Sequence, residues 1–279
     1  MIIEPSEMND AELLDLLRES PPGSPAIHPR LLRLQGPPRV GRFEVSGLLG
    51  GGAMGIVYAA RDTDTDEPVA LELMVREHEL GDSTEDARAR LLREGWVAGQ
   101  LDHPAIVRVR ETGVVGDRLY LVMDRILGGT LDRWHAETSP DWVAILDILR
   151  QAGEGLASAH GAGYVHRDIK PTNILVDGDE RAYLVDFGLA RPILRSIDIV
   201  DAEYLAPELR AGARANPASD QYAFCVMAAK LLEINPGLQR SSIDGVPLRL
   251  CAAIARGLQR LPKDRWPDVD SLLAAMHEA

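Results

Sequence analysis

The sequence predicts an α+β fold of two lobes, in which a small strand-rich N-terminal lobe precedes a larger helical C-terminal lobe. Short β-rich runs come first in the chain, at 42–49, 56–61, 69–75, 106–112 and 118–123. Apart from a helical stretch at 83–101, the helix-like runs come after them, at 141–162, 218–234, 247–260 and 268–278. Strands that precede helices, instead of alternating with them, indicate an α+β architecture.

Residues 1–39 form an N-terminal extension in this reading, with the first lobe at 40–124 and the second at 125–279. Residues 8–20 have the pattern of a short amphipathic helix with four leucines on one side, namely Leu13, Leu14, Leu16 and Leu17. Residues 21–38 contain six prolines, which interrupt regular structure. The extension is therefore either a disordered leader or a strap packed on the domain, and proline density leaves both open.

Composition excludes several classes of partner. The 279 residues carry a formal net charge of −13, which argues against nucleic acid and against an anionic membrane surface as partners. No apolar run reaches the ~18 residues of a membrane span. The start of the chain lacks the basic and apolar regions of a secretory signal, so we expect a cytoplasmic protein. Cys225 and Cys251 lie in apolar stretches and are expected to be buried free thiols.

A glycine-rich segment at 50–57 (GGGAMGIV) fits the phosphate-covering pattern G-x-G-x-x-G-x-V. Its pattern residues are Gly50, Gly52, Gly55 and Val57. Glycines permit a close approach of backbone to phosphate. A dinucleotide-binding loop shares G-x-G-x-x-G, and Glu72 would supply its acidic residue. That alternative requires a helical crossover, whereas 56–61 is strand-like and an acidic turn follows it, so a hairpin fits better.

Three further motifs occur in a fixed order: HRDIKPTN at 166–173, DFG at 186–188 and APE at 206–208. With the glycine segment, they make the chain from Arg42 onward resemble the bacterial eukaryotic-like (Hanks-type) Ser/Thr protein kinases. The resemblance implies a bilobal protein kinase-like fold, ATP with Mg²⁺ (or Mn²⁺) as cofactors, and a protein substrate or regulated protein partner.

The resemblance also assigns roles to the catalytic loop and to DFG. Asp168 would accept the proton of the substrate hydroxyl, and Lys170 would steady the transferred phosphate. Asn173 and Asp186 would provide oxygen ligands to the metal ion.

Nucleotide-binding positions carry over individually from the family. Glu94 matches the helix glutamate, Met123 the gatekeeper before the hinge, and Ala70 and Leu175 the residues on either side of adenine. The backbone of Asp124 and Ile126 would bond the adenine. Structural roles carry over as well: Glu208 and Arg265 resemble a buried ion pair, Asp220 resembles the aspartate that supports the catalytic loop, and His166 resembles its packed histidine.

The first departure from the family is Glu72, which stands where the strand motif V-A-I-K has the lysine that binds ATP phosphates. No lysine precedes Lys170, so a lysine on a neighbouring strand cannot replace it. If Glu72 approached Glu94 as the usual lysine does, two like charges at about 4 Å would repel by roughly 4 kcal/mol at an effective dielectric of 20. We therefore expect the two carboxylates to lie beyond hydrogen-bonding distance.

Two more departures lie in the second lobe. Between Asp186 and Glu208 the only hydroxyl groups belong to Ser196 and Tyr204, and Val200-Asp201 replaces the usual Gly-Thr. Only residues 231–246 separate two of the helical runs, where relatives have an extra helix. These features leave two functions open: a Ser/Thr kinase of weak activity, or a pseudokinase that binds nucleotide and regulates a partner.

Overall fold

The computed structural model describes residues 39–51, 55–74, 101–115, 118–186 and 202–277. The predicted helix at 8–20 lies outside these residues, as do Gly52, Glu94 and all of the predicted helix at 83–101 except Leu101, which is not helical. The chain divides into two compact units. Unit 1 comprises Met1–Gln100 and Arg108–Arg125, and unit 2 comprises Leu101–Val107 and Ile126–Ala279.

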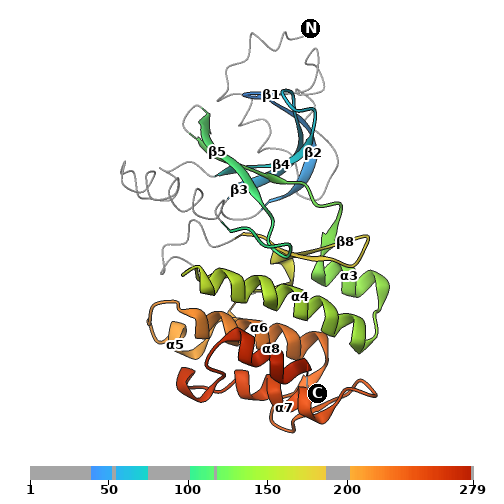
Figure 1. The fold of residues 1–279 in the computed structure, drawn as a ribbon, viewed down its shortest axis with the longest axis vertical. Helices are drawn as coiled ribbons and strands as arrows, with labels where there is room; N and C mark the ends of the chain where they lie inside the picture. Colours follow the sequence, from blue (N-terminus) through green and yellow to red (C-terminus); the bar gives the residue numbers. More distant parts are fainter. Residues whose placement is uncertain (1–38, 52–54, 75–100, 116–117, 187–201, 278–279) are drawn as a thin grey trace. The chain divides into compact units, whose positions relative to one another are not determined.

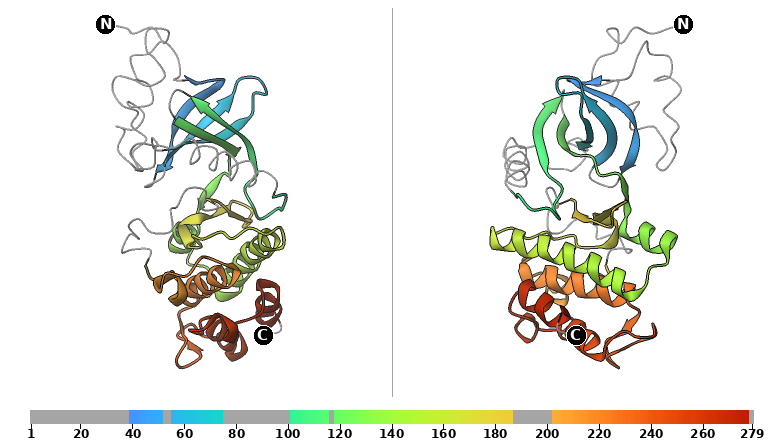
Figure 2. Two further views of the ribbon diagram at one scale, coloured as in Figure 1. Left: turned by 90° about the vertical axis from the view of Figure 1, so that its left-hand side faces the viewer. Right: turned by 45° about the vertical axis from the view of Figure 1, so that its right-hand side comes forward.

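Unit 1 is built on one curled antiparallel sheet with the strand order β1-β2-β3-β4-β6-β5 (Figure 1). Its strands are β1 (Arg39–Val40), β2 (Phe43–Gly51), β3 (Gly55–Asp62), β4 (Pro68–Met74), β5 (Val109–Val115) and β6 (Arg118–Asp124). The curvature of the sheet is clearest in Figure 2. Its buried apolar side chains form the core of unit 1.

Strand β4 carries the alternation that a sheet with one buried face requires. Val69, Leu71 and Leu73 are almost fully buried in the core of unit 1, with Phe43 and Val122. Ala70 and Glu72 therefore point to the opposite face of the sheet.

Strands β2 and β3 are directly paired, with Gly50 opposite Val57 and Gly51 opposite Ile56. The glycine segment is thus part of a β-hairpin, and the dinucleotide-binding alternative with its helical crossover is excluded. The acidic turn that follows β3 is held locally, because the buried Asp62 accepts bonds from the backbone of Asp64 and from the Arg42 side chain.

Unit 2 is mainly helical (Figure 1). Its helices are α3 (Leu131–Thr138), α4 (Trp142–Gly161), α5 (Pro207–Arg210), α6 (Pro217–Leu231), α7 (Leu248–Gly257) and α8 (Val269–His277), with 3₁₀ turns η4 (Pro171–Asn173) and η5 (Pro262–Asp264). A small sheet joins β7 (Gly128–Thr130), β8 (Ile174–Asp177) and β9 (Ala182–Leu184). A hairpin pairs β10 (Ile234–Asn235) with β11 (Arg240–Ser241).

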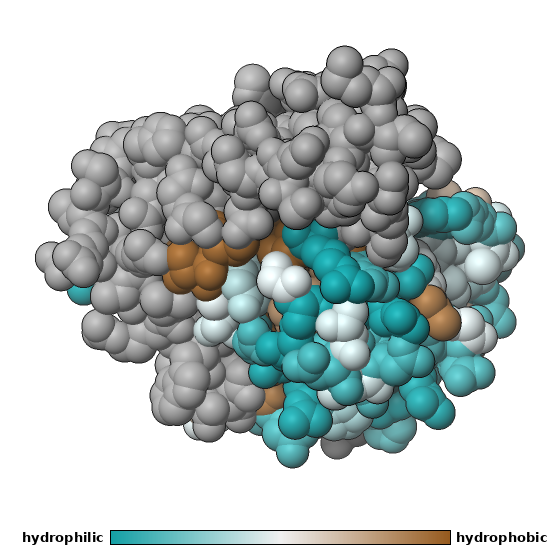
Figure 3. All heavy atoms as spheres, turned by 90° about the horizontal axis from the view of Figure 1, so that it is seen from above, coloured by the Kyte–Doolittle hydropathy of each residue, from teal (hydrophilic) through white to brown (hydrophobic). Residues whose placement is uncertain are grey.

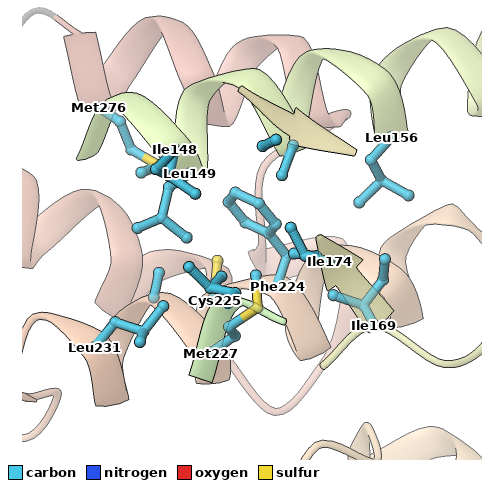
Figure 4. Packing of buried hydrophobic residues seen from close by; sticks show 14 of the residues in the cluster. Ile148, Leu149, Leu156, Ile169, Ile174, Phe224, Cys225, Met227, Leu231 and Met276 are labelled. Carbon is cyan, nitrogen blue, oxygen red and sulfur yellow. The ribbon is translucent and has the colours of Figure 1, made fainter. Parts of the chain in front are cut away.

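Helix α6 is the centre of the core of unit 2. A capping box between Asn216 and Ser219, with Pro217 in the first turn, starts the helix. Most of its residues are buried, and Phe224, Cys225 and Met227 pack against α4 residues such as Leu149 (Figure 4). Both cysteines are buried and free, as the sequence predicted.

Two helix ends were predicted too late in the chain. The helix expected at 218–234 ends at Leu231, because Glu233 takes a positive φ of 47° and the chain turns into β10. The helix expected at 247–260 ends at Gly257.

The β10–β11 hairpin occupies the stretch between α6 and α7, which was expected to lack a helix. Asn235 starts its turn by accepting bonds from the backbone of Gly237 and Leu238. No helix within the described ranges is long and apolar enough to cross a membrane. Hydrophilic residues predominate among the described residues on the face drawn in Figure 3.

Candidate active site

The catalytic loop at 166–173 is supported by Asp220, which lies in the first turn of α6 and is almost fully buried. Its carboxylate accepts the backbone N–H groups of His166 at 2.7 Å and of Arg167 at 2.8 Å. Arg167 has a φ of 72°, a left-handed conformation that costs energy in a non-glycine residue. The two bonds to Asp220 hold this conformation, and they confirm the supporting role predicted for Asp220.

His160 makes a third contact to the same carboxylate, with its Nε2 2.9 Å from Asp220 Oδ2. The residue lies in the last turn of α4 and is mostly buried. Sequence reasoning did not identify this contact. The two residues are 60 positions apart, so no local pattern in the sequence pairs them.

His166 connects the catalytic loop to the DFG motif. Its Nδ1 accepts the backbone N–H of Asp168 at 3.3 Å, which assigns the ring proton to Nε2, and Nε2 donates to the carbonyl oxygen of Val185 at 2.9 Å. Complete burial lowers the pKa of His166, so the ring is neutral at pH 7 and both contacts are satisfied. The residue before Asp186 is thereby tied to the loop that carries Asp168.

The three residues predicted to be catalytic lie together in unit 2. Lys170 Nζ is 3.2 Å from Asp168 Oδ2. The side-chain amide of Asn173 donates to the carbonyl oxygen of Asp168 at 2.8 Å and to its Oδ2 at 2.9 Å. These contacts fix the orientation of the Asp168 carboxylate, which is a requirement for a residue that positions a substrate hydroxyl.

A backbone hydrogen bond brings the two predicted metal ligands, Asn173 and Asp186, close to each other. The N–H of Val185 donates to the carbonyl oxygen of Asn173 at 3.0 Å, which brings Asp186 beside Asn173. Because the Asn173 NH₂ group donates to Asp168, its Oδ1 remains the acceptor for a cation. An amide oxygen and a carboxylate are hard oxygen donors that suit Mg²⁺, so the residues present fit this ion.

Asp186 is a second strained position, with a φ of 58°. Together with Arg167, it places left-handed backbone within two of the sequence motifs. Strain of this kind persists only where the surrounding structure determines it, and it is concentrated at functional sites.

In unit 1, the predicted adenine-binding positions occupy paired strands. Ala70 of β4 is directly opposite Met123 of β6, and both are buried. The N–H of Asp124 donates to the carbonyl oxygen of Arg108 at 3.0 Å, so this N–H group is already used within unit 1. Arg110 bonds the Asp124 side chain. Ile126 and Leu175 belong to unit 2, where Leu175 pairs with Thr130 and with Tyr183.

Glu72 lies between Val57 of β3 and Leu121 of β6, and its side chain extends along Gly55. A Cβ atom on Gly55 would be 3.0 Å from Glu72 Oε1 and 2.7 Å from the carbonyl oxygen of Leu73. Position 55 therefore requires glycine. A negative charge stands next to the glycine hairpin, at the position where the family has a phosphate-binding lysine.

The ion pair predicted between Glu208 and Arg265 is confirmed. The guanidinium, buried in unit 2, donates to both carboxylate oxygens at 2.7 Å and also to the carbonyl oxygens of Ala218 and Gln259. Burial by itself would raise the pKa of Glu208, but the bonds from Arg265 hold that pKa below its usual value. The pair fixes the APE motif to the helical core.

A second set of contacts, which sequence reasoning missed, holds residues 202–205. Arg210 donates to the carbonyl oxygens of Ala202 and Leu205. Lys230 lies 2.5 Å from Glu203 and 5.1 Å from the ring centre of Tyr204. These contacts join α5 and α6 to an adjacent loop, and only the tertiary fold brings them together.

Comparison with known proteins identifies the class. The family model "Protein kinase domain" matches residues 43–273. Serine/threonine-protein kinase PknE of Mycobacterium bovis is 36% identical over 267 residues, which cover 86% of this chain and 46% of that protein. Serine/threonine-protein kinase PknL of Mycobacterium tuberculosis is 34% identical over 253 residues, covering 81% of this chain and 63% of that protein.

Among solved structures, the crystal structure of the M. tuberculosis PknI kinase domain matches with a TM-score of 0.69 at 28% identity, covering 86% of this chain and 96% of that one. The chain thus belongs to the protein kinase family, and mycobacterial Ser/Thr kinases are among its relatives. Its fold is the protein kinase fold, with unit 1 as the β-rich N-lobe and unit 2 as the helical C-lobe. The chain spans less than half the length of PknE.

Proposed function

We propose that this chain is a cytoplasmic Ser/Thr protein kinase-like protein that binds Mg–ATP and transfers its γ-phosphate slowly to protein hydroxyl groups. The observation that carries the proposal is the cluster in the C-lobe, where Lys170 and Asn173 both contact the carboxylate of Asp168. When bound, Mg²⁺ with ATP supplies charge neutralisation for phosphoryl transfer. Asn173 and Asp186 would hold the ion, and Asp168 would orient the attacking oxygen and accept its proton.

The nucleotide would contact the N-lobe and hinge at the positions named from the family motifs. The glycine hairpin would cover the phosphates, and the adenine would lie against Ala70 and Leu175, beside Met123. The carbonyl of Asp124 and the backbone of Ile126 would bond its edge. Gly52 and Glu94, which lie outside the described residues, are also expected to belong to this nucleotide-binding site.

Slow transfer follows from the charge at position 72. A phosphate group bound at the glycine hairpin would be repelled by the Glu72 carboxylate beside Gly55, whereas a lysine at this position would attract it. Since an interaction accelerates transfer only by favouring the transition state, loss of the cation and gain of a repulsive charge both reduce the rate.

A pseudokinase is the second candidate, and a specific observation favours it. In unit 2 the short hairpin β10–β11 lies between α6 and α7. Family relatives are expected to have a helix at this place, which they use to dock substrates. Together with Glu72, this suits a module that binds nucleotide and regulates a protein partner without transferring phosphate.

Transfer of labelled γ-phosphate separates the two candidates. The unmodified protein, Glu72→Lys and Asp168→Asn are incubated with labelled Mg–ATP and a general protein substrate. Incorporation by the unmodified protein above that of Asp168→Asn supports the kinase. Equal incorporation by these two, with nucleotide binding intact, supports the pseudokinase.

A further inference from the structure

Arg110 is an extra residue in strand β5, which lies at one edge of the sheet of unit 1. Val109 is paired with Met123 and Glu111 with Val122. Between these two pairs β5 contains one residue more than β6, and that residue is Arg110. The arrangement is a β-bulge, which redirects a side chain and is common at sheet edges and beside active sites. The bulge adjoins the end of β6, where the hinge begins.

The redirected side chain binds the last residue of β6. Its Nε donates to Oδ1 of Asp124, and its Nη1 donates to Oε2 of Glu67, in the turn between β3 and β4. The side chain of Arg110 is 33% exposed, so water competes only in part for these bonds. A guanidinium carries its donors in a planar fork, which lets one arginine hold two carboxylates from different elements in fixed positions.

Asp124 is therefore held to β5 at two points. Besides the bond from Arg110, the Asp124 N–H donates to the carbonyl oxygen of Arg108 at 3.0 Å. On the other side of β6, Val69 of β4 is opposite Asp124. A residue whose N–H group and side chain are both bonded has little freedom to rotate, and this restraint fixes the direction of its carbonyl group.

We propose that Arg110 is a positioning residue for nucleotide selection, which holds the Asp124 carbonyl group in the direction that accepts the 6-amino group of adenine. Guanine has an oxygen at this position, and a carbonyl group held in a fixed direction would repel it. Arg110 would thereby favour ATP over GTP without touching either nucleotide. The inference rests on the proposed function, in which the carbonyl group of Asp124 bonds the adenine.

Competition of Mg–ATP and Mg–GTP against a ribose-labelled fluorescent ADP tests the proposal, with the ratio of the two dissociation constants as the readout. Both nucleotides carry the same triphosphate, so loss of the Arg110 charge weakens both equally and leaves their ratio unchanged. Loss of positioning changes the ratio. In Arg110→Ala the preference for ATP is expected to fall about tenfold, the effect of one hydrogen bond to the base. Arg110→Lys should keep part of the preference, because an ammonium group can still bond Asp124.

Two further variants separate positioning from a general effect on the sheet. Arg39→Ala removes an arginine that pairs with Glu44 on β2, and it should leave the preference for ATP unchanged. Asp124→Ala removes the carboxylate that Arg110 binds, so it should lower the preference as Arg110→Ala does. The double variant should lose no more than the single variants, because Arg110 acts through Asp124. Circular dichroism establishes that each variant is folded.

The outcomes separate this inference from the proposed function. A folded Arg110→Ala protein with an unchanged preference for ATP overturns the positioning role and leaves the proposed function intact. An equal fall in Arg39→Ala also overturns it, because the effect would then belong to any ion pair of the sheet. Equal affinity of the unmodified protein for the two nucleotides overturns this inference alone, whereas binding of neither overturns the proposed function as well.

Discussion

Replacement of Glu72 by lysine is the perturbation with the clearest expected gain of activity. The side chain lies at the glycine hairpin, beside Gly55, which has no Cβ atom to obstruct it. Glu72→Lys changes the local charge by two units, from −1 to +1. Glu72 is partly exposed, so the dielectric of water is the appropriate limit. In that limit one charge pair at 4 Å is worth about 1 kcal/mol, and two units amount to about 2 kcal/mol for each phosphate charge.

An effect of about 2 kcal/mol corresponds to roughly thirtyfold in rate, and we take tenfold, or about 1.4 kcal/mol, as the minimum increase. The assay is initial-rate transfer of labelled γ-phosphate at saturating Mg–ATP, with circular dichroism to establish that each variant is folded. Glu72→Gln is the matched control, because it removes the repulsion without adding a cation. Its rate is expected to lie between those of the unmodified protein and Glu72→Lys.

A folded Glu72→Lys protein that is no faster than the unmodified one would refute this reasoning. The limiting defect would then lie in the segment between Asp186 and Glu208 or in the replacement of a helix by β10–β11. A Glu72→Gln rate equal to that of Glu72→Lys would show that repulsion alone, and not the missing cation, limits the reaction.

Three further results are expected. ATP binding, followed by calorimetry, should be weak and should require a divalent cation, because Asp186 would repel an uncompensated triphosphate; tight binding in the presence of a chelator would contradict this. The midpoint of urea unfolding should fall as pH is lowered from 7.5 to 5.5, because the pKa of His166 is depressed in the folded state and the unfolded state, with its usual histidine pKa of about 6.5, therefore binds the proton first. This pH dependence should be smaller in His166→Gln. A midpoint that stays constant over this range would argue against a buried neutral ring. Arg265→Met should reduce the free energy of unfolding by about 3 kcal/mol, since it leaves the Glu208 carboxylate without its partner. The control Arg133→Ala breaks only an exposed pair and should reduce this free energy by no more than about 0.5 kcal/mol. Equal losses in the two variants would refute the importance of the buried pair.

The sequence allowed accurate prediction wherever a motif is contiguous in the chain. Asp168, Lys170 and Asn173 lie within six residues, so the pattern alone places them in one loop. Strands β2, β3, β4 and β6 were also predicted, because these runs alternate or are β-rich and are bounded by turn residues, whereas β1 was not predicted and β5 begins three residues after the start of the run predicted at 106–112. The hairpin at the glycine segment followed from the lack of space for a crossover helix.

Contacts between distant parts of the chain could not be predicted in the same way. The bond between His160 and Asp220 depends on how α4 packs against α6. The hydrogen bond from the Asp124 N–H to the Arg108 carbonyl oxygen depends on the register at the end of β6. The direction of the Glu72 side chain toward Gly55 depends on the pairing of β3 with β4, and the separation of Glu72 from Glu94 stays a prediction.

The support of the catalytic loop by Asp220 has an evolutionary consequence. His166 and Asp220 are parts of the packed interior of the C-lobe, so selection for a stable fold preserves them whether or not phosphate is transferred. The Asp168 carboxylate and Lys170 are only partly enclosed, and folding by itself places weaker demands on them. In a lineage that had abandoned catalysis, substitutions would therefore accumulate first at these two positions and last at the interior pair.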